Sequence, residues 1–263
     1  MSELSVGTLS DKDIKEFCQN GKLITEEFNE RNVKQACYEL RASNIYYDIT
    51  VSDRKIEVAD DSYILIKPKQ LVVIMTLEGL EMPPNILGRI LTKGKLFSIG
   101  LLPVNTYADP GFSGNLGIVF SNLSNNYLKI KPRESIAKIE FSKLEKNVER
   151  SYSGQHGFQT GVWPVPREMI LTEEEVRNDP RIKNIPEEIV LSHGSNVGKV
   201  IDRIYKYERK FVIATIGYFT FTLVLIAALQ GTNWITPVSS ILLGVFSNVL
   251  YTFVTWAATN FRR

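Results

Sequence analysis

Apolar and polar residues alternate along two stretches of the chain as half-buried β-strands require. From Ile56 to Met75 the alternation predicts two strands joined by a turn at Lys67-Pro68. Between Gly100 and Leu144 an apolar run breaks at Ala108-Asp109-Pro110-Gly111 and resumes as short strands separated by Asn/Ser and Lys-Pro turns. Because Pro presets one dihedral of a turn and Gly permits a positive φ, we expect Asp109 at a tight corner of an all-β core.

A helical pattern precedes these strands. Leu9 to Phe17 predicts an amphipathic helix with Ser10 as its cap, acidic residues in its first turn, and Ile14 and Phe17 facing inward. Residues 1–165 are expected to form one domain.

The composition changes after Val165. Residues 166–210 are expected to be a charged linker, with a short helix at Thr172–Arg177, followed by a neck helix. The apolar stripe between Glu187 and Lys210 would pair with its symmetry mates, although Gly194 and Gly198 interrupt it.

Two uncharged apolar segments close the chain, within residues 211–263. Phe211–Leu229 and Val238–Thr259 hold about 19 and about 22 residues, each enough to cross ~30 Å of hydrocarbon. Basic residues flank their outer ends, whereas residues 230–237 between them carry no charge. The positive-inside rule then predicts a two-helix anchor in the inner or cell membrane, with both termini and the first domain cytoplasmic.

Bulk composition excludes some functions. The 263-residue chain has a net charge of +2 with scattered basic residues, which argues against nucleic acid as a partner. Its two cysteines, Cys18 and Cys37, form no C-x-x-C pair, and its two histidines, His156 and His193, form no H-x-E motif. The ligand set of a zinc deaminase is therefore missing.

Ordered motifs carry a family resemblance. They are Gln35–Arg41 (QACYELR), Ala108–Gly114 (ADPGFSG), Asn122-Leu123-Ser124 and Lys131–Ile139 (KPRESIAKI). Their order and spacing closely resemble the dCTP deaminase/dUTPase superfamily from roughly Leu9 to Val165. The resemblance implies a mainly β, β-clip (dUTPase-like) barrel, a homotrimer, and a nucleotide bound at a subunit boundary.

The segment that cradles phosphates in that superfamily is altered here. The resemblance places it at Thr92–Leu101, where Gly94 replaces a Ser and Ser98 replaces the Arg that polarises the active-site water of deaminases. Lys93, Lys95 and the backbone N–H groups around Gly94 could still bind a polyphosphate. A lysine-flanked surface turn is the alternative.

The strand after the Asp109 turn departs further. The resemblance aligns Gly117, Ile118 and Val119 with the nucleotide-binding strand, and Val119 with the Glu that activates water against C4 of cytosine. A valine cannot carry a proton, so we expect no deamination. Asp109 matches the acid that in dUTPases contacts the sugar and orients the hydrolytic water. It is the catalytic candidate if the protein hydrolyses a nucleotide, with Mg²⁺ arriving on the phosphates.

The Gly- and Ser-rich stretch Ser151–Val162 resembles the closing lid of the superfamily. Gln159 matches the lid Gln that binds the triphosphate, and Gln155 replaces a Lys. A flexible loop would have the same composition.

Taken together, the sequence predicts a membrane-anchored, trimeric nucleotide sensor with a degenerate deaminase site, in a setting such as antiviral defence. The alternative is an active membrane-bound dUTP or dCTP pyrophosphatase that uses Asp109. A purely structural scaffold would leave Asp109, Gln159 and the lysines unexplained.

Overall fold

The computed structural model describes residues 6–154, 161–230, 244–249 and 251–252. These residues fall into two compact units, Met1–Arg167 and Glu168–Arg263.

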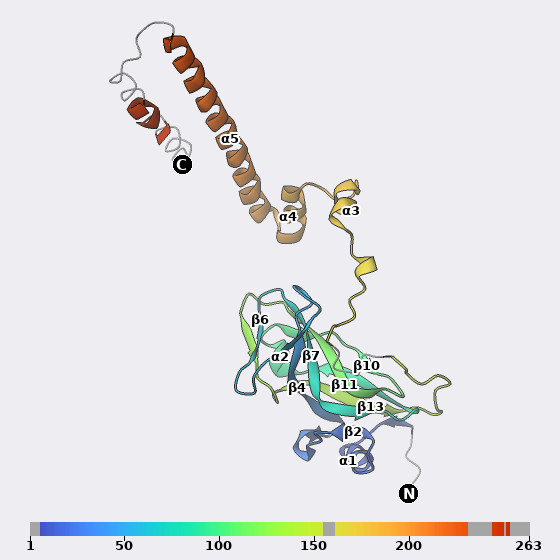
Figure 1. Ribbon diagram of the computed structural model, residues 1–263. Helices are drawn as coiled ribbons and strands as arrows, with labels where there is room; N and C mark the ends of the chain where they lie inside the picture. The colour runs from blue at the N-terminus through green and yellow to red at the C-terminus, as the bar shows by residue number, and fades with distance from the viewer. Residues whose placement is uncertain (1–5, 155–160, 231–243, 250, 253–263) are drawn as a thin grey trace. The chain divides into compact units, whose positions relative to one another are not determined.

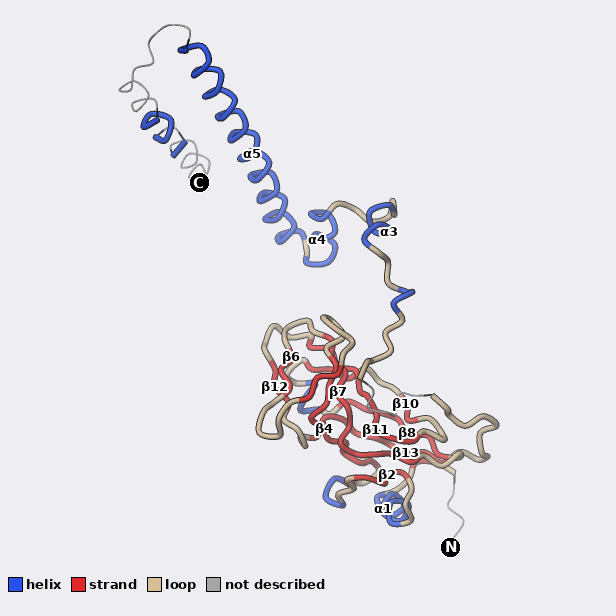
Figure 2. The backbone as a smooth tube through the Cα atoms, in the orientation of Figure 1, coloured by secondary structure: helices blue, strands red, loops and turns tan. Residues whose placement is uncertain are grey.

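The first unit is an antiparallel β-structure, which confirms the mainly β prediction (Figure 1). An 11-stranded sheet follows the path β10-β8-β13-β4-β7-β11-β9, and Figure 2 shows its strands curling around the unit, with the separate β6–β12 pair at one end. The strands of the two sheets together are β1 (Gly7–Thr8), β2 (Leu23–Glu26), β3 (Val33–Lys34), β4 (Cys37–Tyr47), β5 (Lys55–Glu57), β6 (Ile64–Ile66), β7 (Leu71–Glu81), β8 (Ile86–Thr92), β9 (Leu101–Pro103), β10 (Tyr107–Ala108), β11 (Ser113–Asn122), β12 (Leu128–Ile130) and β13 (Ser135–Lys143). The helical elements of this unit are α1 (Asp11–Gln19), η1 (Glu30–Asn32) and α2 (Gly94–Phe97).

Strand β4 joins the two halves of the sheet. Its first half pairs with β13, where Tyr38 lies opposite Ile139, and its second half pairs with β7, where Tyr46 lies opposite Ile74. Burial alternates along both β4 and β11, so one face of each strand enters the main core. Ile118, Phe120 and Phe141 are among its fully buried side chains.

Helix α1 lies beside β2 at the edge of the first unit (Figure 1). The Ser10 side chain accepts a hydrogen bond from the Asp13 N–H, and the Asp13 carboxylate accepts one from the Ser10 N–H. This capping box satisfies donors that the helix start would otherwise leave unpaired. Ile14 is fully buried, so the predicted cap and inward face are both confirmed.

The second unit is helical. After η2 (Arg167–Met169) come α3 (Glu173–Asn178), α4 (Ile185–His193) and the 36-residue α5 (Ser195–Gln230). The predicted short helix at Thr172–Arg177 is confirmed as α3, with Thr172 as its cap. Gly194 has a φ of 88° and ends α4. The single neck helix that was expected is therefore divided into α4 and α5 at this residue.

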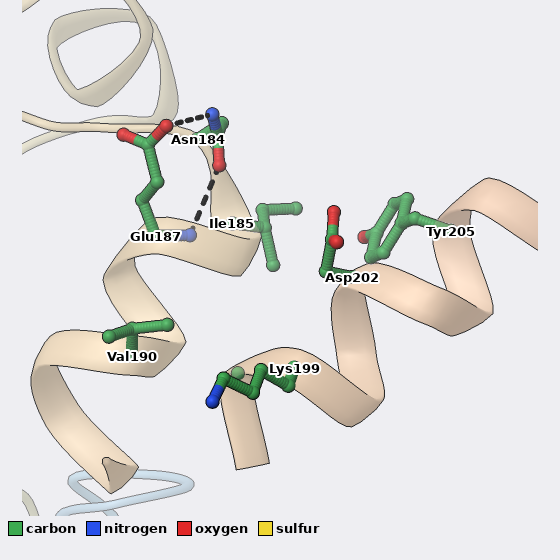
Figure 3. Close-up of a pocket in the computed structure, with 8 residues that line it drawn as sticks. Asn184, Ile185, Glu187, Val190, Lys199, Asp202 and Tyr205 are labelled. Atoms are coloured by element: carbon green, nitrogen blue, oxygen red, sulfur yellow. Dashed lines mark hydrogen bonds between the residues drawn. The ribbon is translucent and has the colours of Figure 1, made fainter. Parts of the chain in front are cut away.

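A pocket of about 670 Å³ lies between α4 and the start of α5 (Figure 3). Asn184 caps α4 by accepting from the Glu187 N–H at 3.1 Å, and its amide donates to the Glu187 carboxylate at 2.8 Å. Ile185, Val190 and Tyr205 add apolar surface. The polar rim of this pocket is thus used for helix capping.

The prediction of a membrane localisation is wrong, and the two-helix anchor on which it depended is not supported. No helix among the described residues is both long enough and apolar enough to span a bilayer. The predicted first segment, Phe211–Leu229, is the continuation of α5, which begins at Ser195 and carries Lys199, Asp202 and Arg203 in its first turns. Most of the predicted second segment, Val238–Thr259, lies outside the described residues. The predicted topology depended on this anchor and is therefore not supported either.

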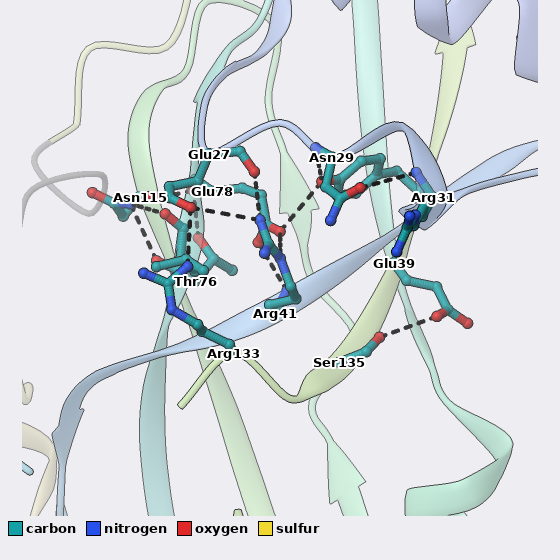
Figure 4. Close-up of polar contacts among 12 residues, drawn as sticks. Glu27, Asn29, Arg31, Glu39, Arg41, Thr76, Glu78, Asn115, Arg133 and Ser135 are labelled. Carbon is teal, nitrogen blue, oxygen red and sulfur yellow. Dashed lines mark hydrogen bonds and ion pairs between the residues drawn. The ribbon is translucent and has the colours of Figure 1, made fainter. Parts of the chain in front are cut away.

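A buried ion pair ties β4 to β7 (Figure 4). The Glu78 side chain is fully buried, and its carboxylate accepts from Arg41 Nε at 2.6 Å and from the Arg41 backbone N–H at 2.8 Å. Burial raises the pKa of the Glu78 carboxyl above its ordinary value of 4.5, and the Arg41 donors offset part of that shift.

The same region contains a β-bulge. The β7–β11 register shifts between Asn115 and Gly117, where Thr76 to Glu78 oppose a single residue. The Asn115 amide donates to the backbone oxygens of Thr76 and Glu78, at 3.1 and 3.2 Å, and the Leu116 N–H donates to the Thr76 hydroxyl at 2.9 Å. The bulge therefore keeps its hydrogen bonds while turning Glu78 toward Arg41.

Arg41→Met should lower the free energy of unfolding by about 3–5 kcal/mol, because it leaves the Glu78 charge buried and unpaired. The raised pKa of Glu78 would rise further. Because a raised folded-state pKa favours the fold at low pH, the loss should shrink as the pH falls toward 4.5. Urea unfolding at several pH values measures both effects.

Arg133→Met is the matched control, because it breaks only a partly exposed pair with Glu27 and should cost less than about 1 kcal/mol. Equal losses for the two variants, or a defect in Arg41→Met that grows on acidification, would contradict the assigned role of the buried pair.

Candidate functional site

The Asp109 turn is held from two sides. The Phe112 N–H donates to the Asp109 backbone oxygen at 2.9 Å, and the Gly111 N–H donates to the Met82 oxygen at 3.1 Å. Gly111 has a φ of 89°, and a Cβ there would lie 2.6 Å from Ser151 Cβ, so only glycine fits. The half-buried Asp109 carboxylate takes part in none of the hydrogen bonds or ion pairs found among the described residues. This turn presents a carboxylate that a ligand could engage.

The predicted nucleotide-binding strand points its residues to opposite faces of β11. Ile118 is fully buried in the main core, so its side chain cannot reach a ligand. Gly117 and Val119 face the other way, opposite Met75 and Val73 of β7. Their face belongs to a second apolar cluster, whose members are Ile45, Tyr47, Val73 and Met75, with Ile49, Val119 and Trp163 packed against them.

Trp163 covers part of this face and was missed by the sequence analysis. A Cβ added at Gly117 would lie 2.4 Å from Trp163 Cη2 and 3.0 Å from Val73 Cγ1. The indole can therefore pack against β11 at this position only because residue 117 is glycine. Its ring lies 5.5 Å from the ring of Tyr47. Trp163 follows Gly117 by about 46 positions in the sequence, which is too far for a local sequence pattern to predict the contact.

The predicted phosphate segment forms α2 and the residues around it. Lys93 precedes α2, and its ammonium contacts the Glu39 carboxylate at 3.0 Å with both side chains less than one-fifth exposed, at 19% and 18%. The Lys93 hydrogen bond and charge outweigh burial and lower the pKa of Glu39. The Lys93 ammonium is therefore already paired inside the first unit, with a glutamate of the QACYELR motif.

Lys95 is far more accessible. Its side chain is 72% exposed, and its ammonium contacts Glu134 at 2.9 Å. The exposed Gly94 has open space where a Cβ would lie, so the backbone there is open to a ligand. Ser98 is also exposed, and its hydroxyl donates to the Lys95 backbone oxygen at 2.8 Å.

A cationic groove of about 580 Å³ runs beside α2. Its charged lining residues are Lys95, Lys129, Lys131, Arg133 and Glu134. Four positive groups against one carboxylate favour an anion. The sequence analysis assigned only Lys95 among these residues to the binding site, although the close spacing of Lys129, Lys131 and Arg133 in the sequence was available as a signal.

The two halves of the candidate site lie apart within one chain. Ala108, next to Asp109, pairs with Gly88 of β8, whereas Lys93 follows Thr92 at the opposite end of that strand. Five residues of strand span roughly 17 Å. One chain therefore does not bring the Asp109 turn to the α2 lysines. The predicted lid residues Gln155 and Gln159 lie outside the described residues.

The described residues include no group of three or more His, Cys, Asp or Glu side chains that could hold a metal ion. Asp109 supplies one carboxylate, which does not by itself fit Mg²⁺, an ion that usually keeps several waters and is bound with substrate phosphates.

Glu39→Gln should remove a pH-dependent part of the stability. The lowered folded-state pKa means that ionised Glu39 stabilises the fold above its ordinary pKa of 4.5, and that this contribution is lost as the pH falls through the lowered value. We expect the variant to be less stable than the wild type by about 1 kcal/mol at pH 7, with the difference shrinking below pH 4.5. Urea unfolding measures it.

Glu16→Gln on α1 is the control, because Glu16 is exposed and its loss should change stability by less than about 0.5 kcal/mol. A Glu39→Gln difference that persists undiminished in acid would show that the ion pair with Lys93 is not its source.

Comparisons with known proteins place this chain beside a family of nucleotide enzymes. A family model described as dCTP deaminase-like matches residues 8–144. A dCTP deaminase from Pyrococcus horikoshii is 30% identical over 135 residues, which cover 51% of this chain and 85% of the relative. A dUMP-forming dCTP deaminase from Aquifex aeolicus is 26% identical over 181 residues, 65% of this chain and 99% of the relative.

Among solved structures, a 2′-deoxycytidine 5′-triphosphate deaminase from Agrobacterium tumefaciens aligns with 53% of this chain and 49% of its own, at 13% identity and a TM-score of 0.47. With the family model matched over more than half of its length, the protein belongs to the dCTP deaminase-like family.

Proposed function

We propose that the first unit binds a deoxynucleoside triphosphate such as dCTP or dUTP and does not deaminate it. The observation that carries this proposal is the chemistry around Val119. Its described neighbours in the second cluster are apolar or aromatic, including Tyr47, Val73 and Trp163. Such a face can bind a base by apolar contact and stacking, and Val119 itself has no group that can transfer a proton.

Deamination at C4 needs a group that takes a proton from water and returns one to the leaving nitrogen. The resemblance places that group at residue 119, where the side chain is valine. The arginine that would polarise the water corresponds to Ser98, whose hydroxyl already donates to the Lys95 backbone oxygen. The relatives named as dCTP deaminases share the domain with this protein, whereas neither Val119 nor Ser98 has the group that the proposal requires for this proton-transfer step.

The phosphates would bind at the other half of the site. Lys95 is exposed enough to leave Glu134 for a stronger anion, and the cationic groove continues through Lys129, Lys131 and Arg133. Charge-assisted contacts of this kind are roughly twice as strong as neutral hydrogen bonds. Lys93 would act mainly by holding Glu39 and so positioning the start of α2.

A nucleotide would touch both halves only if they came from different subunits. The roughly 17 Å that separates Asp109 from the α2 lysines along β8 supports a shared site. A closed ring of identical subunits, such as the expected trimer, would set one subunit's Asp109 turn beside the cationic groove of the next.

Binding without deamination fits a nucleotide sensor whose output is carried by the helical second unit. Ligand binding would have to favour one state of that unit over another to produce a signal. Antiviral defence remains a prediction for the biological setting.

A second candidate function is hydrolysis of the triphosphate. The observation that favours it is the Asp109 carboxylate, which is half-buried on a rigid turn and has no hydrogen-bond partner among the described residues. It could orient a water molecule, with the metal supplied on the nucleotide.

The wild type should release no ammonia from dCTP, because residue 119 cannot transfer a proton. An ammonia assay, run beside isothermal titration that confirms binding, checks this expectation. Asp109→Asn should weaken binding and leave the ammonia signal at background. Ammonia release that depends on Asp109 would contradict the proposal.

Replacing Lys93 and Lys95 together with Ala should weaken dCTP and dUTP binding by at least ~10-fold. The loss of Lys95 removes one charge-assisted contact worth about 1.5–3 kcal/mol, where each 1.4 kcal/mol is a factor of ten, and the loss of Lys93 releases Glu39 beside α2. Lys12→Ala with Lys22→Ala is the matched control, because it removes the same charge from exposed positions near α1. Equal weakening in both double variants would mean that net charge, and not the α2 segment, attracts the nucleotide.

A further inference from the structure

The proposed function leaves Trp163 unexplained. The indole lies over Gly117 so closely that a Cβ at that position would come within 2.5 Å of two of its ring atoms. It also packs on the cluster that contains Val119 and Val73. The candidate base-binding face is therefore covered in part by a side chain of the protein itself.

Residues 161–167, which we call the strap, hold Trp163 in place. The Trp163 backbone N–H donates to the Asp53 backbone oxygen at 2.7 Å, and the Lys55 backbone N–H donates to the Gly161 backbone oxygen at 2.9 Å. An isolated β-bridge pairs Arg54 with Val162. The strap is thus fastened to the chain just before and at the start of β5.

The far end of the strap is fastened by one ion pair. The Arg167 guanidinium contacts the Asp53 carboxylate at 2.5 Å, with the Arg167 side chain 72% exposed. Solvent-exposed pairs of this kind contribute little to stability. The strap therefore lies outside the 11-stranded sheet and is joined to it by an isolated β-bridge, so it can open while the sheet stays intact.

We propose that Trp163 is a displaceable plug on the nucleotide site. Its indole and the base of the nucleotide compete for the Gly117 and Val119 face, so nucleotide entry releases the strap from Asp53 and Lys55. This inference rests on the proposed function, which assigns that face to the base. Because the strap ends at Arg167, where the first unit ends, its release alters the segment that continues into the second unit.

A contrasting role for Trp163 would be a wall on which the base stacks. The two roles predict opposite results. Removing a plug increases the fraction of protein that is competent to bind and tightens apparent affinity, whereas removing a stacking wall weakens it.

The test is titration of the full chain with dCTP and with dUTP. Trp163→Ala should bind the preferred nucleotide at least ~10-fold more tightly than the wild type, as expected if about one molecule in ten is open at rest. Arg167→Met should shift affinity in the same direction by a smaller factor, because it loosens the strap without touching the base-binding face. Arg181→Met is the matched control, since it breaks a comparably short pair with Asp179 in the second unit and should change nothing.

A wild type that binds, with Trp163→Ala binding equally or more weakly, overturns the plug and leaves the proposed function standing. If neither protein binds dCTP or dUTP, the proposed function fails and the plug fails with it.

A fluorescence measurement keeps the proposal testable if Trp163→Ala does not fold. The chain has three tryptophans, so Trp234→Phe with Trp256→Phe leaves Trp163 as the only indole emitter. Saturating nucleotide should shift its emission to the red as the indole leaves the apolar cluster for water. An unchanged or blue-shifted spectrum with bound nucleotide overturns the plug.

Discussion

The buried pair of Glu78 and Arg41 is the constraint on which the first unit depends. It joins β7 to β4 at the point where β4 changes partners, and it needs the β7 bulge to bring the Glu78 carboxylate inward. A buried carboxylate that loses its donors becomes an uncompensated charge, so arrangements that separate Glu78 from Arg41 are strongly disfavoured. The pair therefore fixes the register of β7, and with it the side of β11 on which Gly117 and Val119 lie.

What the site can do follows from that register. The face that contains Gly117 and Val119 packs in an apolar cluster, which is the property on which its proposed role in holding a base depends. The positive charge that a polyphosphate needs gathers at the far end of β8, in the groove that includes Lys95. Because the two regions are separated along one strand, the family's shared site between subunits is the arrangement that would unite them. Trp163 then gives the apolar face an occupant when no nucleotide is present.

Local signals in the sequence predicted local structure well. The Ser10 cap, the Asp109 turn and the short helix after Leu171 each depend on residues within a few positions, and each forms as expected. The contacts between distant residues could not be predicted in this way. Nothing near Lys93 indicates that Glu39 holds it, and nothing near Gly117 indicates that Trp163 covers it. The apolar composition after Phe211 suggested a separate membrane segment, whereas the residues form one helix with the charged turns after Ser195.

The central claim is that the protein binds a deoxynucleoside triphosphate and leaves its base unchanged. Equilibrium dialysis of the full chain against a mixture of dCTP and dUTP, with mass spectrometry of both compartments, tests it most directly. The account predicts an excess of at least one intact triphosphate on the protein side and no change in the total amount of either nucleotide. No excess on the protein side, or conversion of dCTP to dUTP, would contradict it.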